Sequence, residues 1–176
     1  MEERNIGLKY GLIAGIVVIA GYLGLFYTDP ALLFRRMGML AFAILLVTMI
    51  WTGRVFRRKH GDIELSFREF VRPIFTVFVV SMGVVIVFHY LFYNFSGSGM
   101  DALIKEWFLE EGRRQMELAN KPPEFIEKEL LILENGDYSY GLFKSLQTYV
   151  LSLVFGFLMA TFIVVGFIYA RLLRLR

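Results

Sequence analysis

The sequence predicts an all-α integral membrane protein with four transmembrane helices. Hydrophobic residues make up 57% of the 176 residues and charged residues 20%, against roughly 45–50% and 25% in a soluble domain. The apolar residues gather in four runs that contain no charged side chain, at residues 10–28, 37–53, 73–95 and 145–170. A helix needs about 20 residues to cross a bilayer, and none of these runs alternates as barrel strands do. Residues 1–176 are therefore expected to form a single four-helix membrane domain.

The composition also excludes several classes of protein. The chain has no Cys, which rules out disulfide-stapled and zinc-thiolate modules. A formal net charge of +3 is too small for a dedicated nucleic-acid binder. The sequence lacks a zinc-protease motif and a glycine-rich phosphate loop. The four runs also lack the carboxylate that a proton- or cation-coupled transporter usually needs. We therefore expect no catalytic residue, no metal site and no cofactor, and we expect that the protein is not an enzyme.

Small residues recur at four-residue spacing in the first and last spans. They are Gly7, Gly11 and Gly15 in the first, and Ser152, Gly156 and Ala160 in the last. This spacing places each set on one helix face, where small side chains let helix backbones approach closely. Either these faces pack within the four-helix bundle, or they form a seam with a second copy or a partner; a homo-oligomer would use the glycine face of the first span.

Helix-start signals precede the second and third spans. Asp29 followed by Pro30 predicts an N-cap and a first helical turn, so the second helix should begin before its apolar run. Ser66 and Glu69 have the spacing of a capping box. The third helix is therefore expected to begin directly after Ser66.

Basic residues predict the orientation in the membrane. A basic patch follows the second span and consists of Arg54, Arg57, Arg58 and Lys59. The side that holds this patch and both termini has 11 Lys and Arg residues and a net charge of +6, and the opposite side has 8 and a net charge of −3. The positive-inside rule then places both termini in the cytoplasm, although Arg35 and Arg36 would lie outside. The patch is either a topology anchor or a docking site for anionic lipid or a partner.

Residues 96–144, between the third and fourth spans, predict an extracytoplasmic amphipathic helical hairpin. Its apolar stripes include Leu103, Trp107 and Phe108 in the first helix, and Phe125 and Leu130 in the second. The prolines of residues 121–123 separate the two helices, and Glu110 and Arg114 have the spacing of an ion pair. Two short helices cannot build a core of their own. The stripes must therefore rest on the membrane surface, on the spanning bundle or on a partner.

His89 is the one imidazole within a predicted span. An ionisable residue inside the membrane is a functional candidate by default. His89 lies near the outer end of the third span, beside Tyr90 and Asn94. A neutral, hydrogen-bonded histidine at the membrane interface is therefore the favoured interpretation, and a functional histidine is the alternative.

Several segments of the chain resemble a family of bacterial membrane proteins. They are the octapeptide 8–15, Gly61 with the hexapeptide 65–70, and the tripeptide 93–95. Together with the charged helical insertion and the glycine-bearing last span, they resemble the uncharacterised Bacteroidota family called domain of unknown function 4199. This resemblance implies four spans and residence in the inner membrane. It implies no activity and no functional residues.

The two exposed surfaces, the basic patch and the hairpin, are the functional candidates. We expect a non-enzymatic, multi-pass protein of the bacterial inner (cytoplasmic) membrane, an accessory or assembly subunit of an envelope complex. Its surfaces would contact the lipid bilayer and a membrane-protein partner or a second copy. The alternative is a small oligomeric transporter, flippase or lipid-binding protein, which would need a polar path between its helices. Neither interpretation involves nucleic acid.

Overall fold

The computed structural model describes residues 2–60, 66–97 and 99–174 of the chain. These residues form six α-helices and contain no β-strand. The helices are α1 (Glu2–Thr28), α2 (Pro30–His60), α3 (Phe67–Phe95), α4 (Met100–Leu118), α5 (Pro123–Glu134) and α6 (Leu142–Arg174). The predicted all-α class is therefore confirmed.

Four of these helices, α1, α2, α3 and α6, are long and apolar enough to cross a membrane. The apolar stretches are Ile6–Thr28, Pro30–His60, Phe67–Phe95 and Leu142–Ala170. The predicted number of candidate spans is confirmed, and each predicted span lies within one of these helices. The helices are longer than the charge-free runs because charged turns continue the helical backbone beyond the apolar core.

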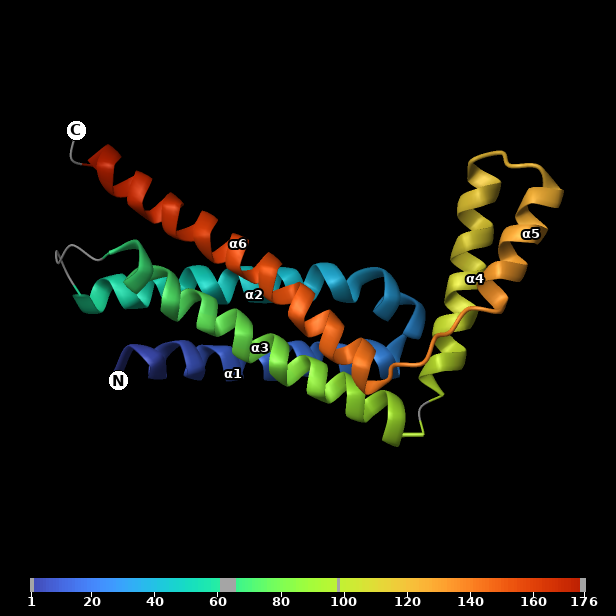
Figure 1. Cartoon of the computed structure of the whole chain (residues 1–176), viewed down its shortest axis with the longest axis horizontal. Coiled ribbons are helices and arrows are strands. Elements are labelled where there is room, and N and C mark those ends of the chain that lie inside the picture. The colour runs from blue at the N-terminus through green and yellow to red at the C-terminus, as the bar shows by residue number, and fades with distance from the viewer. Residues whose placement is uncertain (1, 61–65, 98, 175–176) are drawn as a thin grey trace.

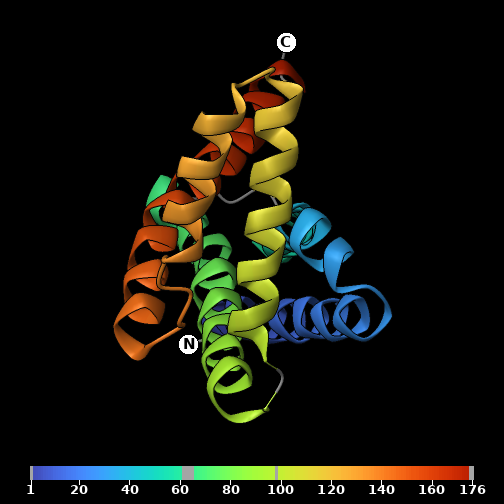
Figure 2. The same cartoon turned by 90° about the vertical axis from the view of Figure 1, so that its right-hand side faces the viewer.

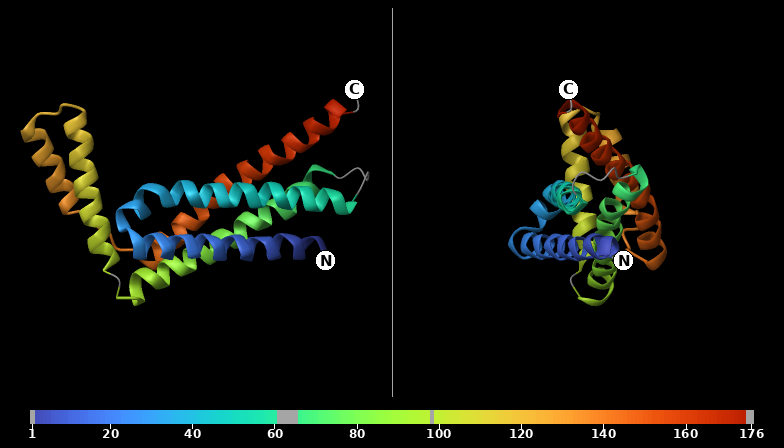
Figure 3. Two further views of the ribbon diagram at one scale, coloured as in Figure 1. Left: turned by 180° about the vertical axis from the view of Figure 1, so that it is seen from behind. Right: turned by 90° about the vertical axis from the view of Figure 1, so that its left-hand side faces the viewer.

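The four long helices run side by side as a bundle (Figure 1). The central helix is α3, which packs against α1, α2 and α6. Toward its C-terminal end α6 diverges from α1 and α2 (Figure 1). Both chain termini lie at the same end of the bundle (Figure 3). We call the opposite end, where α1 joins α2, the hairpin end.

Two clusters of buried side chains fill the bundle. In the larger cluster Met49, Ile74, Val77 and Val164 are fully buried, so that α2, α3 and α6 share one core. The smaller cluster joins α1, α2, α3 and α4, and it contains Val18, Tyr22, Leu33, Met37, Val85 and Met100. The first residue of α4 therefore belongs to the core of the bundle.

Both predicted helix starts are confirmed. At the start of α2, Asp29 Oδ1 accepts hydrogen bonds from the backbone N–H groups of Ala31 at 2.9 Å and Leu32 at 3.3 Å. At the start of α3, Ser66 Oγ accepts the Glu69 N–H at 3.3 Å. In return, Glu69 Oε2 accepts the Ser66 N–H at 2.8 Å. These bonds satisfy backbone donors that have no partner within the helix.

The predicted helical hairpin is formed by α4 and α5. It lies across the hairpin end of the bundle, and its free end, where α4 turns into α5, projects beyond the bundle (Figures 1 and 2). The hairpin reaches the bundle through α4, which contacts α2 as well as α5.

Candidate functional site

The hairpin is attached to the bundle along one face of α4. Met100, at the start of α4, is only 1% exposed. Further along, the ring centroid of Trp107 lies 5.3 Å from that of Phe34 in α2. One turn later, Glu111 Oε2 lies 3.6 Å from Arg35 Nη2. Because these three α4 residues share one helical face, α4 rests on the first turns of α2.

Glu111 is the carboxylate around which the polar side chains of this junction gather. Besides facing Arg35, it accepts hydrogen bonds from Arg114 Nη2 at 2.7 Å and Gln115 Nε2 at 3.0 Å. The bond from Arg114, with that from Gln115, holds the pKa of the Glu111 carboxyl below its ordinary value. Arg114 is therefore paired with Glu111, and the predicted pairing with Glu110 is wrong. Glu111 lies on the face that meets Arg35, so one carboxylate serves both guanidinium groups.

The segment that returns from α5 to α6 is fixed at two further points. The Tyr138 hydroxyl donates to the backbone oxygen of Leu133 at 2.6 Å, and its ring centroid lies 5.6 Å from that of Phe108. Asn94 Nδ2, at the end of α3, donates to the backbone oxygen of Tyr140 at 2.9 Å. These contacts close the hairpin on itself and hold its return segment against α3.

A lysine at the start of α6 completes this attachment. Lys144 Nζ lies 2.7 Å from Asp137 Oδ2 and donates to the backbone oxygens of Asp137 and Ser139, each at 3.0 Å. The bond from Lys144, followed by those from Ser139, holds the pKa of the Asp137 carboxyl far below its ordinary value. The return segment is therefore clamped where it enters the last long helix.

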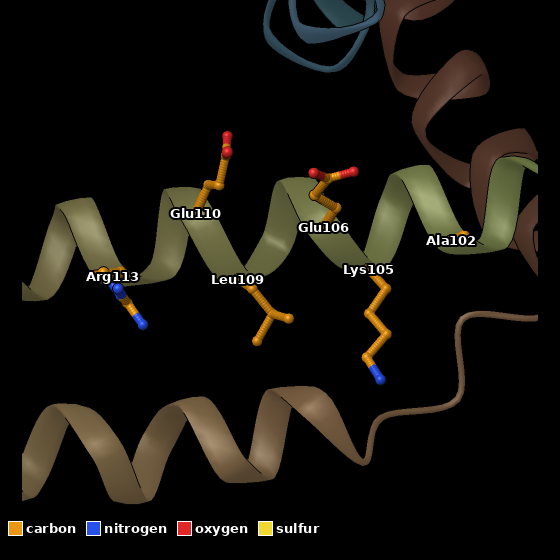
Figure 4. Close-up of a pocket in the computed structure, with 6 residues that line it drawn as sticks. All are labelled: Ala102, Lys105, Glu106, Leu109, Glu110 and Arg113. Carbon is orange, nitrogen blue, oxygen red and sulfur yellow. The ribbon is translucent and has the colours of Figure 1, made fainter.

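The hairpin carries two hollows with mixed charge. The first is lined by Ala102, Lys105, Glu106, Leu109, Glu110 and Arg113. Figure 4 shows Lys105, Leu109 and Arg113 pointing toward α5, and Glu106 and Glu110 pointing away from it. The second hollow is nearer the free end and is lined by Arg113, Glu117, Asn120, Lys121, Pro123, Ile126, Glu127 and Leu130. Among the described residues, no group of His, Cys, Asp and Glu could hold a metal ion.

The predicted apolar stripe residues of the hairpin have three different environments. Leu103 packs against the smaller core cluster, and Trp107 packs against α2. Phe108 contacts the return segment and is 42% exposed. Phe125 is also 42% exposed, while Leu130 lines the second hollow. The bundle therefore supports the first helix of the hairpin, whereas no residue of α5 is buried.

The glycine face of α1 packs against α3. A Cβ atom on Gly7, Gly11 or Gly15 would lie 2.8, 3.0 or 3.3 Å from a backbone carbonyl oxygen of α3. The Ser81 hydroxyl of α3 donates to the backbone oxygen of Gly11 at 2.8 Å. Within the chain this face is filled by α3, so it does not present a free seam to a second copy.

The small-residue face of α6 also packs on α3. A Cβ atom on Gly156 would overlap the ring of Phe78. One turn later Ala160 is fully buried. Ser152 is partly buried, and its hydroxyl donates to the backbone oxygen of Tyr149 at 2.7 Å. Glycine at position 156 therefore makes room for an aromatic ring rather than for a second backbone.

The basic patch occupies the last turns of α2, at the end of the bundle where both termini lie. Arg54, Arg58 and Lys59 are exposed. Arg57 is partly buried, and its Nη1 donates to the backbone oxygen of Phe167 in α6 at 3.5 Å. The patch thus combines an exposed cationic surface with one residue that ties α2 to α6.

His89 lies within a group of tyrosines near the hairpin end. Its ring centroid is 4.6 Å from that of Tyr22 in α1, 6.1 Å from Tyr93 and 6.4 Å from Tyr140. The Tyr22 hydroxyl donates to the Tyr93 hydroxyl at 3.4 Å. His89 Nε2 is buried and has no hydrogen-bond partner among the described residues, so the hydrogen bond expected for this histidine is absent there at Nε2. Sequence reasoning missed Tyr22 and Tyr140, because neither lies near His89 along the chain.

Comparison with known proteins identifies a family. No curated protein and no solved structure matches the chain. A family model described as "Protein of unknown function (DUF4199)" matches residues 9–170, which is most of the chain. The match agrees with the resemblance found in the sequence segments. The chain therefore belongs to the DUF4199 family of proteins of unknown function.

Proposed function

We propose that this protein is a non-enzymatic integral protein of the bacterial inner membrane that serves as an accessory or assembly subunit of an envelope complex. The observation that carries this proposal is a hairpin that is attached through α4 and its return segment but exposes α5. On α5, Leu131 is 60% exposed and Ile132 is 58% exposed. A surface already held in place loses little conformational freedom when a partner binds.

The proposed orientation has both termini and the basic patch in the cytoplasm and the hairpin outside. It follows from the charge difference across the spans and the positive-inside rule. Arg35 and Arg36 oppose it, and Arg35 lies 3.6 Å from Glu111. Because a hairpin carboxylate balances this charge, Arg35 acts as part of the junction rather than as an unpaired cation outside.

The core of the bundle favours an accessory role over the alternative of a small oligomeric transporter, flippase or lipid-binding protein. In the part of the chain that the structure describes, the two buried clusters consist of hydrophobic side chains, and Tyr22 is the one member whose side chain carries a hydroxyl. The buried hydroxyls of Thr52, Ser81 and Ser145 each donate to a backbone carbonyl oxygen. Hydroxyls engaged in this way are occupied by the backbone and do not line a polar path.

Affinity purification from native membranes in a mild detergent tests the accessory role. A partner recovered in a fixed ratio to this protein is expected. The double variant Leu131→Ser and Ile132→Ser should reduce that ratio about tenfold, the loss expected when about 1.4 kcal/mol of binding free energy is removed. The matched control is Leu151→Ser, because Leu151 is 63% exposed on α6 and should leave the ratio unchanged. Repeated recovery of this protein alone would overturn the proposal.

A further inference from the structure

The depth of α4 relative to the spans follows from its contacts on α2. Trp107 and Glu111 meet Phe34 and Arg35 of α2. The charge-free run of α2 begins at Met37, directly after Arg35 and Arg36. Residues that flank the apolar run of a span lie among lipid headgroups. With α2 crossing the membrane, α4 therefore lies at headgroup depth.

The direction of α4 places its C-terminal half beside the bundle rather than on top of it. The helix runs across the ends of the spans, and its C-terminal half projects past them (Figures 1 and 2). A helix that lies across span ends at headgroup depth runs along the membrane surface. The projecting half therefore has lipid beneath it, where the first half has α2.

The face of α4 that meets α2 continues into the projecting half. Trp107, Glu111, Arg114 and Leu118 follow one another at spacings of four, three and four, which keep them on one side of a helix. Leu118 is 73% exposed, although it is a large apolar side chain. The Arg114 side chain is 54% exposed. An exposed leucine and an arginine on the lipid side of a surface helix are the residue types found in interfacial helices.

We propose that this projecting face of α4, defined by Arg114 and Leu118, is seated on the phospholipids of the leaflet in which the spans end. Leu118 reaches the boundary between headgroups and acyl chains. Arg114 keeps its bond to Glu111 and has further N–H groups for a phosphate oxygen, since a guanidinium carries five donors. The seat requires only that α2 crosses the membrane. It does not depend on the accessory role, and it leaves α5 facing away from the lipid.

Single-cysteine labelling in proteoliposomes tests this seat, because the natural chain has no Cys. The full-length variant Leu118→Cys would carry an environment-sensitive fluorophore in vesicles of phosphatidylcholine with some phosphatidylglycerol. Lys128→Cys is the matched control. Leu133 of α5 faces Gly112 of α4, and the helical repeat places Lys128 on the side of α5 turned away from α4. We expect lipids brominated near the headgroup to quench most of the emission at position 118 and little of it at position 128.

Three other outcomes would overturn the proposal. Quenching at position 118 by aqueous iodide, and not by brominated lipid, would place the hairpin in water. Protection from both quenchers would mean that a protein, or a second copy of the chain, covers this face. Quenching of both labels by lipid would place α5 in the bilayer as well. Recovery of a partner is measured separately, by purification from native membranes, so failure of the seat is distinguishable from failure of the accessory role.

A second substitution separates the role of the arginine from that of the leucine. Arg114→Gln in the variant labelled at position 118 should reduce quenching by brominated lipid, because a phosphate ligand is lost. Position 118 is exposed, so labelling it removes no core contact, and unchanged circular dichroism should verify that the variants are folded. Undiminished quenching in the Arg114→Gln variant would show that Arg114 does not bind a phospholipid phosphate.

Discussion

The interface of α1 with α3 and the junction of the hairpin with α2 are stabilised in opposite ways. Between α1 and α3, glycines bring two backbones together, and the Ser81 hydroxyl bonds directly to the Gly11 carbonyl oxygen at 2.8 Å. Between α4 and α2, long side chains meet instead, through the rings of Trp107 and Phe34 and the charges of Glu111 and Arg35. The first interface has almost no freedom to adjust, whereas the second is made of side chains that can move.

This difference reflects the solvent at each place. Lipid provides no hydrophobic force between apolar helices, so close packing and hydrogen bonds must hold them together. At the ends of the spans water and headgroups return, and aromatic and charged side chains are favoured there. Substitutions should therefore have large effects at the glycine interface, moderate effects at the junction of α4 with α2, and small effects at the exposed ion pair of Asp137 and Lys144.

The largest effect is expected for Gly11→Leu. A Cβ atom at this position would lie 3.0 Å from the Val77 carbonyl oxygen, and backbone cannot move aside as a side chain can. Overpacking typically costs about 1–3 kcal/mol, and we expect the free energy of unfolding in detergent to fall by about 3 kcal/mol. Gly24→Leu is the control on the same helix, because a Cβ atom at Gly24 would have no neighbour within 4 Å.

The same comparison can be repeated on α6. Gly156→Leu should destabilise the bundle because the new side chain would overlap Phe78, while Gly166→Leu should not, since nothing lies within 4 Å of a Cβ atom there. Equal losses at the crowded and open glycines of either helix would contradict a role for close backbone packing.

A moderate, local effect is expected for Trp107→Ala. Loss of the contact with Phe34 should let α4 lift from α2 while the bundle stays folded. An aromatic pair contributes about 0.5–1.5 kcal/mol beyond its buried area. Amide hydrogen exchange in α4 should therefore accelerate about tenfold or more, and exchange in α3 should be unchanged.

The control for this prediction is the other tryptophan of the chain. Trp51 is 51% exposed on α2, so Trp51→Ala should leave the exchange of α4 as it is. Equal acceleration throughout the bundle in the Trp107→Ala variant would show that the hairpin is part of the cooperative core rather than attached to it.

The smallest effect is expected for Asp137→Asn. Because Lys144 lowers the pKa of Asp137 in the folded state, the carboxylate stabilises the return segment at neutral pH. This stabilisation is complete above the ordinary pKa of 3.8 and is lost as the pH falls from there toward the folded-state pKa. Amide exchange of residues 137–141, followed as the pH is lowered, should show this loss in the natural protein and not in the variant.

Lys144→Gln provides a check on the partner. It should remove the largest part of the pH dependence that Asp137→Asn removes, because it eliminates the bond from Lys144 and leaves those from Ser139. If Lys144→Gln left the pH dependence intact, the lowered pKa of Asp137 would have to come from Ser139 alone.

Features that depend on residues close together in the sequence could be predicted. The caps at Asp29 and Ser66 involve partners at most three residues away, so their spacing sufficed. The four spans followed from unbroken apolar runs in the same way. Two expectations stay predictions. The side of the membrane on which the hairpin lies depends on the bilayer, and the absence of enzyme activity depends on the substrates that are tested.

Features that depend on distant residues could not be predicted. Tyr22 and Tyr93 are 71 residues apart, and their contact exists only because α1 lies against α3. Arg114 could reach either of two glutamates by helical spacing. In the structure it is paired with Glu111, which also faces Arg35 from another helix. Of the three supports considered for the hairpin stripe, the bundle was assigned to Leu103 and Trp107 only by the packing of α4 against it.

The pairing of α1 with α3 has a consequence for how the protein is made. Synthesis delivers α1 to the bilayer first and α2 second, so the glycine face of α1 has no partner until α3 has also been inserted. During that interval the Gly11 carbonyl lacks the bond from Ser81. The final arrangement of the first helix is therefore decided by a segment that the ribosome has yet to translate when that helix enters the membrane.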